Sequence, residues 1–273
     1  MSMPQDYLPP IKIAGMSKRY FATAGKSAVG MVRAGNEDSA VTSNFLVAVA
    51  DGMGGHAAGE VASKIAIRAI STIAKSLQSK EMAEEEIDEL LAKSIMQIDG
   101  ALANSVDENP SLAGMGTTLS ALFLRDGSIA LLHIGDSRIY RLRGNTFEQL
   151  TVDHTVIQEL LDQGAITESE IATHPQRSVL TQVLMGEGRH LPALITLDIK
   201  AEDRFLLCSD GLTGVVADKE IKAILKGKGR GTAVDALIEA AHINGAPDNV
   251  TVIVADILDN DIQEPESYLG AAK

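Results

Sequence analysis

The sequence contains a single cysteine, no tryptophan, and only 5 phenylalanines and 4 tyrosines. Because Cys208 has no second cysteine to pair with, a disulfide within the chain is excluded. The low aromatic content of 3% disfavours a surface that stacks on bases or sugars. Basic residues are also few, since 24 Lys and Arg stand against 37 Asp and Glu and give a formal net charge of −13 at pH 7. A general nucleic-acid binder needs positive surface, so this class is disfavoured.

Long hydrophobic runs are missing as well. No apolar stretch approaches the roughly 20 residues needed to span a bilayer, and the N-terminus lacks the basic and apolar segments of a secretory signal. We therefore expect a cytoplasmic protein that does not enter a membrane. What is present is an ordinary globular composition, with 45% hydrophobic and 22% charged residues in 273. We expect one domain over residues 20–258, with loose segments at 1–19 and 259–273.

Hydrophobic periodicity divides the chain into two kinds of segment. Apolar residues recur at helical spacing over 58–78 and 82–106. Short apolar or alternating runs predict strands, and the turns between the strands of 117–150 are too short for parallel crossovers. An antiparallel sheet beside separate long helices indicates the α+β class. The expected strands are 45–50, 117–124, 128–134, 138–142, 146–150, 205–208 and 250–257; shorter helices are expected at 156–162 and 234–241, and an irregular insertion at 165–190.

Aspartates stand at the ends of several expected strands. Asp51, Asp136 and Asp210 each follow an apolar run beside a glycine, and Asp248 directly precedes another run. One aspartate beside a glycine is typical of a turn. Four of them brought to shared sheet edges would repel one another unless cations neutralised their charge. Oxygen ligands without a Cys or His cluster favour Mg²⁺ or Mn²⁺ over zinc.

A basic residue near this acidic set points to phosphate chemistry. Arg33 lies a few positions before Glu37 and Asp38, and a guanidinium can hold a phosphoryl group with two parallel hydrogen bonds. Taken alone, Arg33 would more often be an ordinary solvated side chain. Two divalent ions that share a carboxylate can polarise water for in-line attack on phosphorus. The combination therefore predicts a metal-dependent phosphate hydrolase.

The order of these residues resembles the metal-dependent protein serine/threonine phosphatases of the PP2C (PPM) family, in its bacterial form. The resemblance covers about residues 20–257. The matching segments are VRAGNED at 32–38, VADGMGGHAAGE at 49–60, GTTL at 116–119, HIGDSR at 133–138, LTVDH at 150–154, CSDGL at 208–212 and DNV at 248–250. The resemblance implies a four-layer αββα sandwich of two antiparallel sheets flanked by helices, and it identifies 165–190 as a flap near the active site.

The resemblance also implies roles for the matching positions. Asp51 would bridge two Mn²⁺ or Mg²⁺ ions, the carbonyl of Gly52 would bind one of them, and Asp210 and Asp248 would bind the other. Asp136 matches a ligand of a third, weaker ion.

Three more roles follow from the same resemblance. Glu37 and Asp38 match the acidic pair that supports the metals, and Arg33 matches the arginine that grips phosphate. Eukaryotic relatives carry a general-acid histidine directly after the Asp-Gly pair, where this chain has Met53. His56 is the expected substitute, and a metal-bound water is an equal candidate for the proton donor.

The expected activity is hydrolysis of phosphoserine and phosphothreonine in proteins by water activated at the binuclear centre. The expected partners are phosphorylated proteins, among them a bacterial Ser/Thr kinase and its substrates, and the expected state is a monomer. One alternative is an inactive phosphatase fold that serves as an adaptor, but such a chain should have lost a metal carboxylate or Arg33. A dinucleotide site at 52–57 is disfavoured because no acidic residue follows at the required distance.

Overall fold

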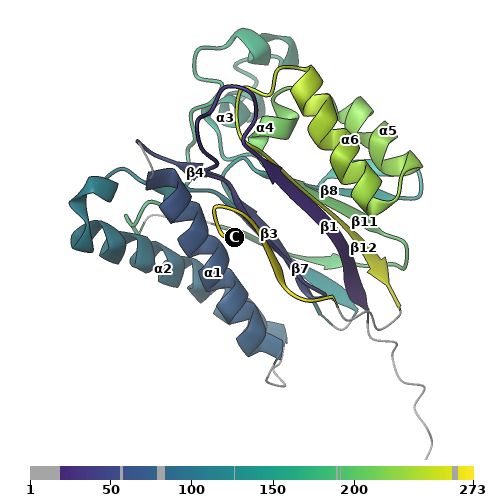
Figure 1. The fold of residues 1–273 in the computed structure, drawn as a ribbon, viewed down its shortest axis with the longest axis horizontal. Helices are drawn as coiled ribbons and strands as arrows, with labels where there is room; N and C mark the ends of the chain where they lie inside the picture. Colours follow the sequence, from purple (N-terminus) through teal and green to yellow (C-terminus); the bar gives the residue numbers. More distant parts are fainter. Residues whose placement is uncertain are drawn as a thin grey trace, which may run out of the picture.

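A computed structural model describes residues 19–55, 58–78, 84–125, 127–188, 190, 192–259 and 264–273. Two large β-sheets lie at the centre, with helices on the outside of each (Figure 1). Every pair of neighbouring strands within these ranges is antiparallel. The structure therefore has the four layers of the expected αββα sandwich. No helix in these ranges is both long and apolar enough to cross a membrane.

The first sheet has the strand order β1-β12-β11-β8-β9. Its central strands β11 and β12 are almost fully buried, because one face packs on the second sheet and the other on helices. Near-continuous apolar sequence is what two buried faces require. The bounds are β1 Tyr20–Ala28, β8 Arg138–Arg143, β9 Thr146–Gln149, β11 Arg204–Cys208 and β12 Val250–Leu258.

The second sheet has the order β10-β7-β6-β3-β2-β13. A further two-stranded pair, β4 with β5, lies at the entrance to the first helix. The bounds are β2 Ser39–Thr42, β3 Leu46–Ala50, β4 Gly52–Met53, β5 Gly116–Thr117, β6 Leu119–Leu124, β7 Ser128–Ile134, β10 Ala193–Asp198 and β13 Ser267–Gly270.

Helices cover the outer face of each sheet (Figure 1). The apolar stripes of the two long helices, α1 and α2, pack on the second sheet, and α4, α5 and α6 pack on the first. A third apolar cluster fills the space between the sheets. The bounds are α1 Ala58–Gln78, α2 Glu84–Glu108, α3 Val156–Asp162, α4 Asp210–Thr213, α5 Asp218–Gly227 and α6 Arg230–Ile243, with short 3-10 turns at Pro110–Leu112 and Glu168–Thr173.

Several expectations need correction. Two strands, β1 and β2, precede the first expected strand at 45–50 and were not predicted. They contain many small residues, so their sequences do not alternate between apolar and polar residues. The strand expected at 117–124 is split at Thr118 into β5 and β6, and β10 and α5 were not expected. The expected tail at 259–273 is not loose at residues 267–270, because they form β13, which pairs with β2 at the edge of the second sheet. Most of the expected N-terminal tail lies outside the described residues.

Candidate active site

The four strand-end aspartates identified in the sequence meet at one edge of the sandwich. Asp51 follows β3, Asp136 lies in the turn from β7 to β8, and Asp210 opens α4 after β11. Asp248 lies just before β12. The charges of Asp38, Asp136, Asp210 and Asp248 all act on Asp51. Antiparallel neighbours bring the end of one strand next to the start of the other, so β11 and β12 deliver Asp210 and Asp248 to the same edge.

The main chain of Asp51 is fixed by two threonines. Its amide donates to the Thr118 hydroxyl over 2.9 Å, and its carbonyl accepts from the Thr118 amide at 2.9 Å and from the Thr117 hydroxyl at 3.0 Å. Gly52 follows, and a Cβ there would lie 2.1 Å from the Gly59 carbonyl oxygen. Only glycine allows this close approach, so α1 starts directly against the site.

Asp38 is completely buried at the centre of the group. Its Oδ2 accepts a 2.7 Å hydrogen bond from the hydroxyl of Ser209, the residue before Asp210, while its Oδ1 has no hydrogen-bond partner among the described residues. Burial raises the pKa of Asp38 to about 7. Side-chain hydrogen bonds from Thr251 and Ser209 oppose this rise, and the charges of Asp210 and Asp248 reinforce it. A buried acceptor without a donor is costly, and this one lies among other carboxylates.

The other carboxyl groups are perturbed in the same direction. Burial, followed by the charges of its neighbours, raises the pKa of Asp51 well above its usual range. Burial and the charge of Asp210 raise the pKa of Asp136 to about 7. Burial also raises the pKa of Asp210, although a hydrogen bond with Asp51 opposes the shift. The protein therefore holds together acidic groups whose full ionisation is unfavourable without added positive charge.

Arg33 supplies positive charge from an exposed loop. Its Nη2 lies 2.6 Å from Oδ2 of Asp248, and 51% of the Arg33 side chain is exposed. Asn249, next to Asp248, fixes the loop: its amide donates to the carbonyls of Val29 and Gly35, each over 2.8 Å, and its carbonyl accepts from the Glu37 amide. The loop thus presents the guanidinium beside the acidic cluster at a defined position.

The donor set suits hard divalent cations. All the side chains in the cluster offer carboxylate oxygens, which Mg²⁺ and Mn²⁺ prefer. The Oδ1 atom of Asp38 has no hydrogen-bond partner in the described part of the chain, and the pKa values of Asp51 and Asp136 are raised. Both observations fit a site where a bound cation would stabilise the carboxylates. In the described ranges, however, no three His, Cys, Asp or Glu side chains are gathered as a ready-made ligand set. Asp248 instead faces Arg33.

Two further residues named from the sequence have different outcomes. Glu37 lies at the edge of the cluster, where burial raises its pKa against the opposing effect of Arg33. His56 lies outside the described residues. Behind Asp136, Arg138 forms a two-pronged ion pair with Asp153, with N–O distances of 2.7 and 3.0 Å. The charge of Asp153 adds to the rise in the pKa of Asp136, and the charge of Arg138 opposes part of that rise.

Sequence reasoning missed an anchor for the flap region. Asp99 on α2 accepts hydrogen bonds from the amides of Met185, Gly186 and Gly188 at 3.2, 2.6 and 2.7 Å. The Nε2 atom of His190 lies 2.8 Å from Oδ1 of the same carboxylate. Burial alone would raise the pKa of Asp99, but these contacts lower it below its usual value. Asp99 is one of many acidic residues in α2, so the local sequence does not indicate this role.

The anchored loop connects to the main chain of the site. Leu184 is fully buried and exchanges two backbone hydrogen bonds with Thr117, at 2.9 and 3.0 Å. Thr117 in turn donates its hydroxyl hydrogen to the carbonyl of Asp51. The part of the expected flap at residues 184–188 is therefore fixed between α2 and β5, the strand that supports Asp51.

Two groups that were considered for other chemistry have structural surroundings. Burial raises the pKa of the Cys208 thiol to about 12, so it stays protonated at neutral pH. His133 is buried, with its ring nitrogens 2.9 Å from the Ser120 hydroxyl and 3.0 Å from the Val152 carbonyl. Its ring stacks on that of His154 with centroids 4.9 Å apart. These contacts are those of core and supporting residues.

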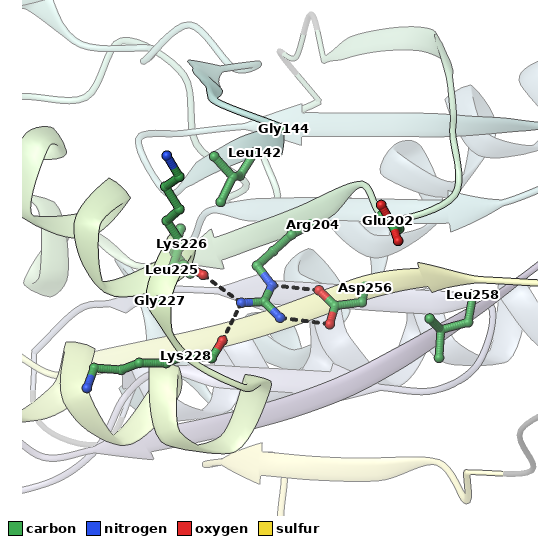
Figure 2. A pocket seen from close by; sticks show the side chains of 10 residues that line it. All are labelled: Leu142, Gly144, Glu202, Arg204, Leu225, Lys226, Gly227, Lys228, Asp256 and Leu258. Atoms are coloured by element: carbon green, nitrogen blue, oxygen red, sulfur yellow. Dashed lines mark hydrogen bonds and ion pairs between the residues drawn. The ribbon is translucent and has the colours of Figure 1, made fainter.

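A pocket at the opposite end of the first sheet is a separate feature. It lies beside the start of β11 and the end of β12, whereas the acidic cluster lies at the other ends of these strands. Figure 2 shows Arg204 at its centre, bonded to both carboxylate oxygens of Asp256 and to the carbonyls of Leu225 and Lys228. Arg204 thus ties the last turn of α5 to the sheet.

Comparisons with known proteins agree with this geometry. The model of the family described as "Protein phosphatase 2C" matches residues 35–239. The serine/threonine protein phosphatase PstP of Mycobacterium tuberculosis is 42% identical over 252 residues, which are 91% of this chain and 47% of PstP. This chain therefore spans about half the length of that relative. The serine/threonine phosphatase stp of Listeria welshimeri is 37% identical over 233 residues, 83% of this chain and 92% of stp.

Solved structures give the same result. A crystal structure of the M. tuberculosis phosphatase PstP/Ppp superposes with a TM-score of 0.81 at 42% identity, covering 87% of this chain and 98% of the other. A second crystal structure, of the PstP catalytic domain in complex with 2 manganese ions, gives a TM-score of 0.80 at 40% identity and covers 88% of this chain and 100% of the other. The αββα arrangement is common to these proteins.

Proposed function

Because this chain belongs to the protein phosphatase 2C family, we propose that it hydrolyses phosphoserine and phosphothreonine in proteins. The observation that carries the proposal is that the charges of Asp38 and of three further strand-end aspartates act on the buried Asp51, beside one exposed guanidinium. The names of the relatives, which are serine/threonine phosphatases, support the same reaction. An adaptor that had lost activity would be expected to lack one of these groups, and this chain retains them all.

Arg33 is proposed to hold the phosphoryl group. Its contact with Asp248 engages one nitrogen atom, and half of the side chain faces solvent. A planar guanidinium presents five N–H donors in a fixed fork, so it can hold an ion pair with Asp248 and still bind phosphate oxygens. Asn249 fixes the position of the loop in advance, which reduces the entropy lost when substrate binds.

The proposed cofactors are two Mn²⁺ or Mg²⁺ ions, with a third at a weaker site. Asp51, the carbonyl of Gly52, Asp210 and Asp248 are the proposed ligands, and Asp136 is the proposed ligand of the third ion. Glu37 and Asp38 would support them. Bound divalent ions supply the positive charge that activates water and stabilises the phosphoryl group during transfer. The PstP catalytic domain crystallised with manganese supports this assignment.

Location and partners are proposed from the same chemistry. We propose a cytoplasmic domain that acts as a monomer on phosphorylated proteins, including a Ser/Thr kinase and its substrates. The general acid is proposed to be His56 or a water molecule. The flap, residues 165–190, is proposed to contact the protein substrate.

Phosphate release from a phosphothreonine peptide tests the activity. We expect release with Mn²⁺, none after complete chelation, and recovery when Mn²⁺ is added back. Asp51→Asn should abolish release because it removes a charge that two cations require, whereas Asp107→Asn, at an exposed position on α2, should not change it. Activity that persists without any divalent ion would refute the proposed mechanism.

Substitution of Arg33 tests the phosphate contact. Arg33→Ala should raise KM for the phosphopeptide more than it lowers kcat, because a substrate-binding group is lost. Arg33→Lys keeps the charge but cannot form two parallel hydrogen bonds to phosphate, so its KM should lie between those of the unaltered chain and Arg33→Ala. If all three proteins gave the same KM, Arg33 would not bind the phosphate.

A further inference from the structure

The C-terminal strap, which we define as residues 264–273, lies on the edge of the second sheet next to the candidate site. Its strand β13 pairs with β2, so that Gly270 stands opposite Ser39 and Ser267 opposite Thr42. Figure 1 shows the end of the chain beside α1 and the strands of the second sheet, rather than extending away from the molecule. Leu269 packs into the apolar cluster between the two sheets, and Tyr268 packs into the cluster under α1.

The strap touches the main chain of Asp38. The amide of Ala271 donates to the Asp38 carbonyl over 2.8 Å. Gly270 has φ +61, and a Cβ at this position would lie 2.1 Å from the same carbonyl oxygen. The backbone of the strap thus lies directly against the peptide group of Asp38, and only glycine permits this approach.

Contacts with α1 hold the strap from the other side. The guanidinium of Arg68 lies 3.7 Å from the centre of the Tyr268 ring, and its Nη2 donates to the Ala272 carbonyl over 2.5 Å. Glu266 accepts a hydrogen bond from Ser71 and pairs with Lys75 at 2.8 Å. The strap is therefore fixed between α1, which begins at the site, and β2, which directly follows Asp38.

Displacement of Asp38 would reach the rest of the acidic cluster. The Asp38 carboxylate accepts from the Ser209 hydroxyl, whose oxygen accepts in turn from the Thr251 amide at 3.0 Å. Ser209 directly precedes Asp210. A rigid chain of contacts therefore runs from Ala271 through Asp38 and Ser209 to Asp210.

We infer that the C-terminal strap is a positioning element of the metal centre, which fixes the Asp38 main chain and thereby strengthens Mn²⁺ binding. The inference rests on the proposed function, since it assumes that this cluster binds divalent ions. A purely structural role would instead affect the stability of the fold while leaving Mn²⁺ affinity unchanged. The two roles are separated by measuring ion binding directly.

The test uses two glycine substitutions with the same backbone conformation. Gly270→Ala places a methyl group against the Asp38 carbonyl, whereas Gly144→Ala, at φ +59, meets nothing within 4 Å. Hydrogen exchange reports whether the strap detaches, calorimetry with MnCl₂ reports affinity, and thermal unfolding reports stability. Outer-shell partners of metal ligands typically contribute about 10- to 100-fold to affinity. We expect Gly270→Ala to weaken Mn²⁺ binding by about tenfold or more, and Gly144→Ala to bind like the unaltered chain.

Each outcome decides the inference. Unchanged Mn²⁺ affinity in Gly270→Ala overturns it, whether or not exchange in the strap becomes faster. If Gly270→Ala does not fold, Arg68→Ala loosens the strap from the α1 side without touching Asp38, and faster exchange with unchanged affinity overturns the inference equally. If the unaltered chain neither binds Mn²⁺ nor releases phosphate, the proposed function has failed instead.

Discussion

The side-chain amide of Asn249 donates a hydrogen bond to the carbonyl of Gly35 over 2.8 Å, which ties the loop carrying Arg33 to the start of β12. The same amide reaches the carbonyl of Val29. Because Asp248 is the adjacent residue, one dipeptide fixes both the acidic group and the loop that presents its cationic neighbour. The loop is therefore positioned by tertiary contacts rather than by its own secondary structure.

Asn249→Asp should disrupt this arrangement. The carboxylate can still accept from the Glu37 amide, but it offers no donor to the carbonyls of Val29 and Gly35. Val29 and Gly35 lie at exposed positions, where water can replace the lost donor, and such a hydrogen bond contributes about 0.5–1.5 kcal/mol. We therefore expect a loss of stability of about 1 kcal/mol in urea unfolding and a higher KM for phosphopeptide. Asn145→Asp, remote from the site and paired with Lys226, is the matched control. Equal KM values for the two variants would contradict the role given to Asn249.

Asp99→Asn should loosen the end of the flap. The neutral amide loses the charge that favours the three backbone donors and the His190 contact. Hydrogen bonds to a charged group contribute about 1.5–3 kcal/mol each, so a loss of about 2 kcal/mol in stability is expected. If the flap contacts protein substrates, KM should rise more for a phosphoprotein than for p-nitrophenyl phosphate. The control is Asp107→Asn on the same helix; proportional changes for both substrates would argue against a flap effect.

His133 should make stability depend on pH. Burial, and then repulsion from His154, lowers its pKa from 6.5 to about 4. The unfolded chain therefore binds this proton first as the pH falls, so the contribution of neutral His133 is complete above about pH 6.5 and is lost towards pH 4. The difference amounts to about 3 kcal/mol. Urea unfolding at several pH values should show a shallower decline for His133→Gln than for the unaltered chain, and parallel curves would exclude His133 as the cause.

Arg204→Met should separate stability from activity. The substitution removes the bonds that tie the end of α5 to Asp256, although Arg230 still pairs with Asp256 at 3.1 Å. We expect a loss of about 2 kcal/mol, the size of one or two hydrogen bonds involving a charged group. Because the acidic cluster lies at the opposite ends of β11 and β12, kcat/KM should stay unchanged. If Arg204→Met lost much of its kcat/KM under conditions where the protein is fully folded, the pocket around Arg204 and the acidic cluster would be coupled.

Local sequence predicted much of the site because the signal there is local. An apolar run that stops at an aspartate identifies a strand and its end together, as for Asp51, Asp136 and Asp210. Short turns excluded parallel pairing among the strands of 117–150, and the convergence of the aspartates was expected from strand ends that share sheet edges. The order of the motifs then resembled one family, whose model matches residues 35–239.

The sequence alone identified the aspartates of the acidic cluster and predicted antiparallel pairing for the strands of 117–150, because strand periodicity, turn length and residue type are properties of neighbours along the chain. Only the tertiary structure decided that the C-terminal strap completes the second sheet beside Asp38, and that Asp99 anchors the flap. These contacts join residues 86 or more positions apart. The periodicity of the local sequence does not predict such contacts. They depend on which sheet edges and backbone amides still lack hydrogen-bond partners once the two sheets have packed together.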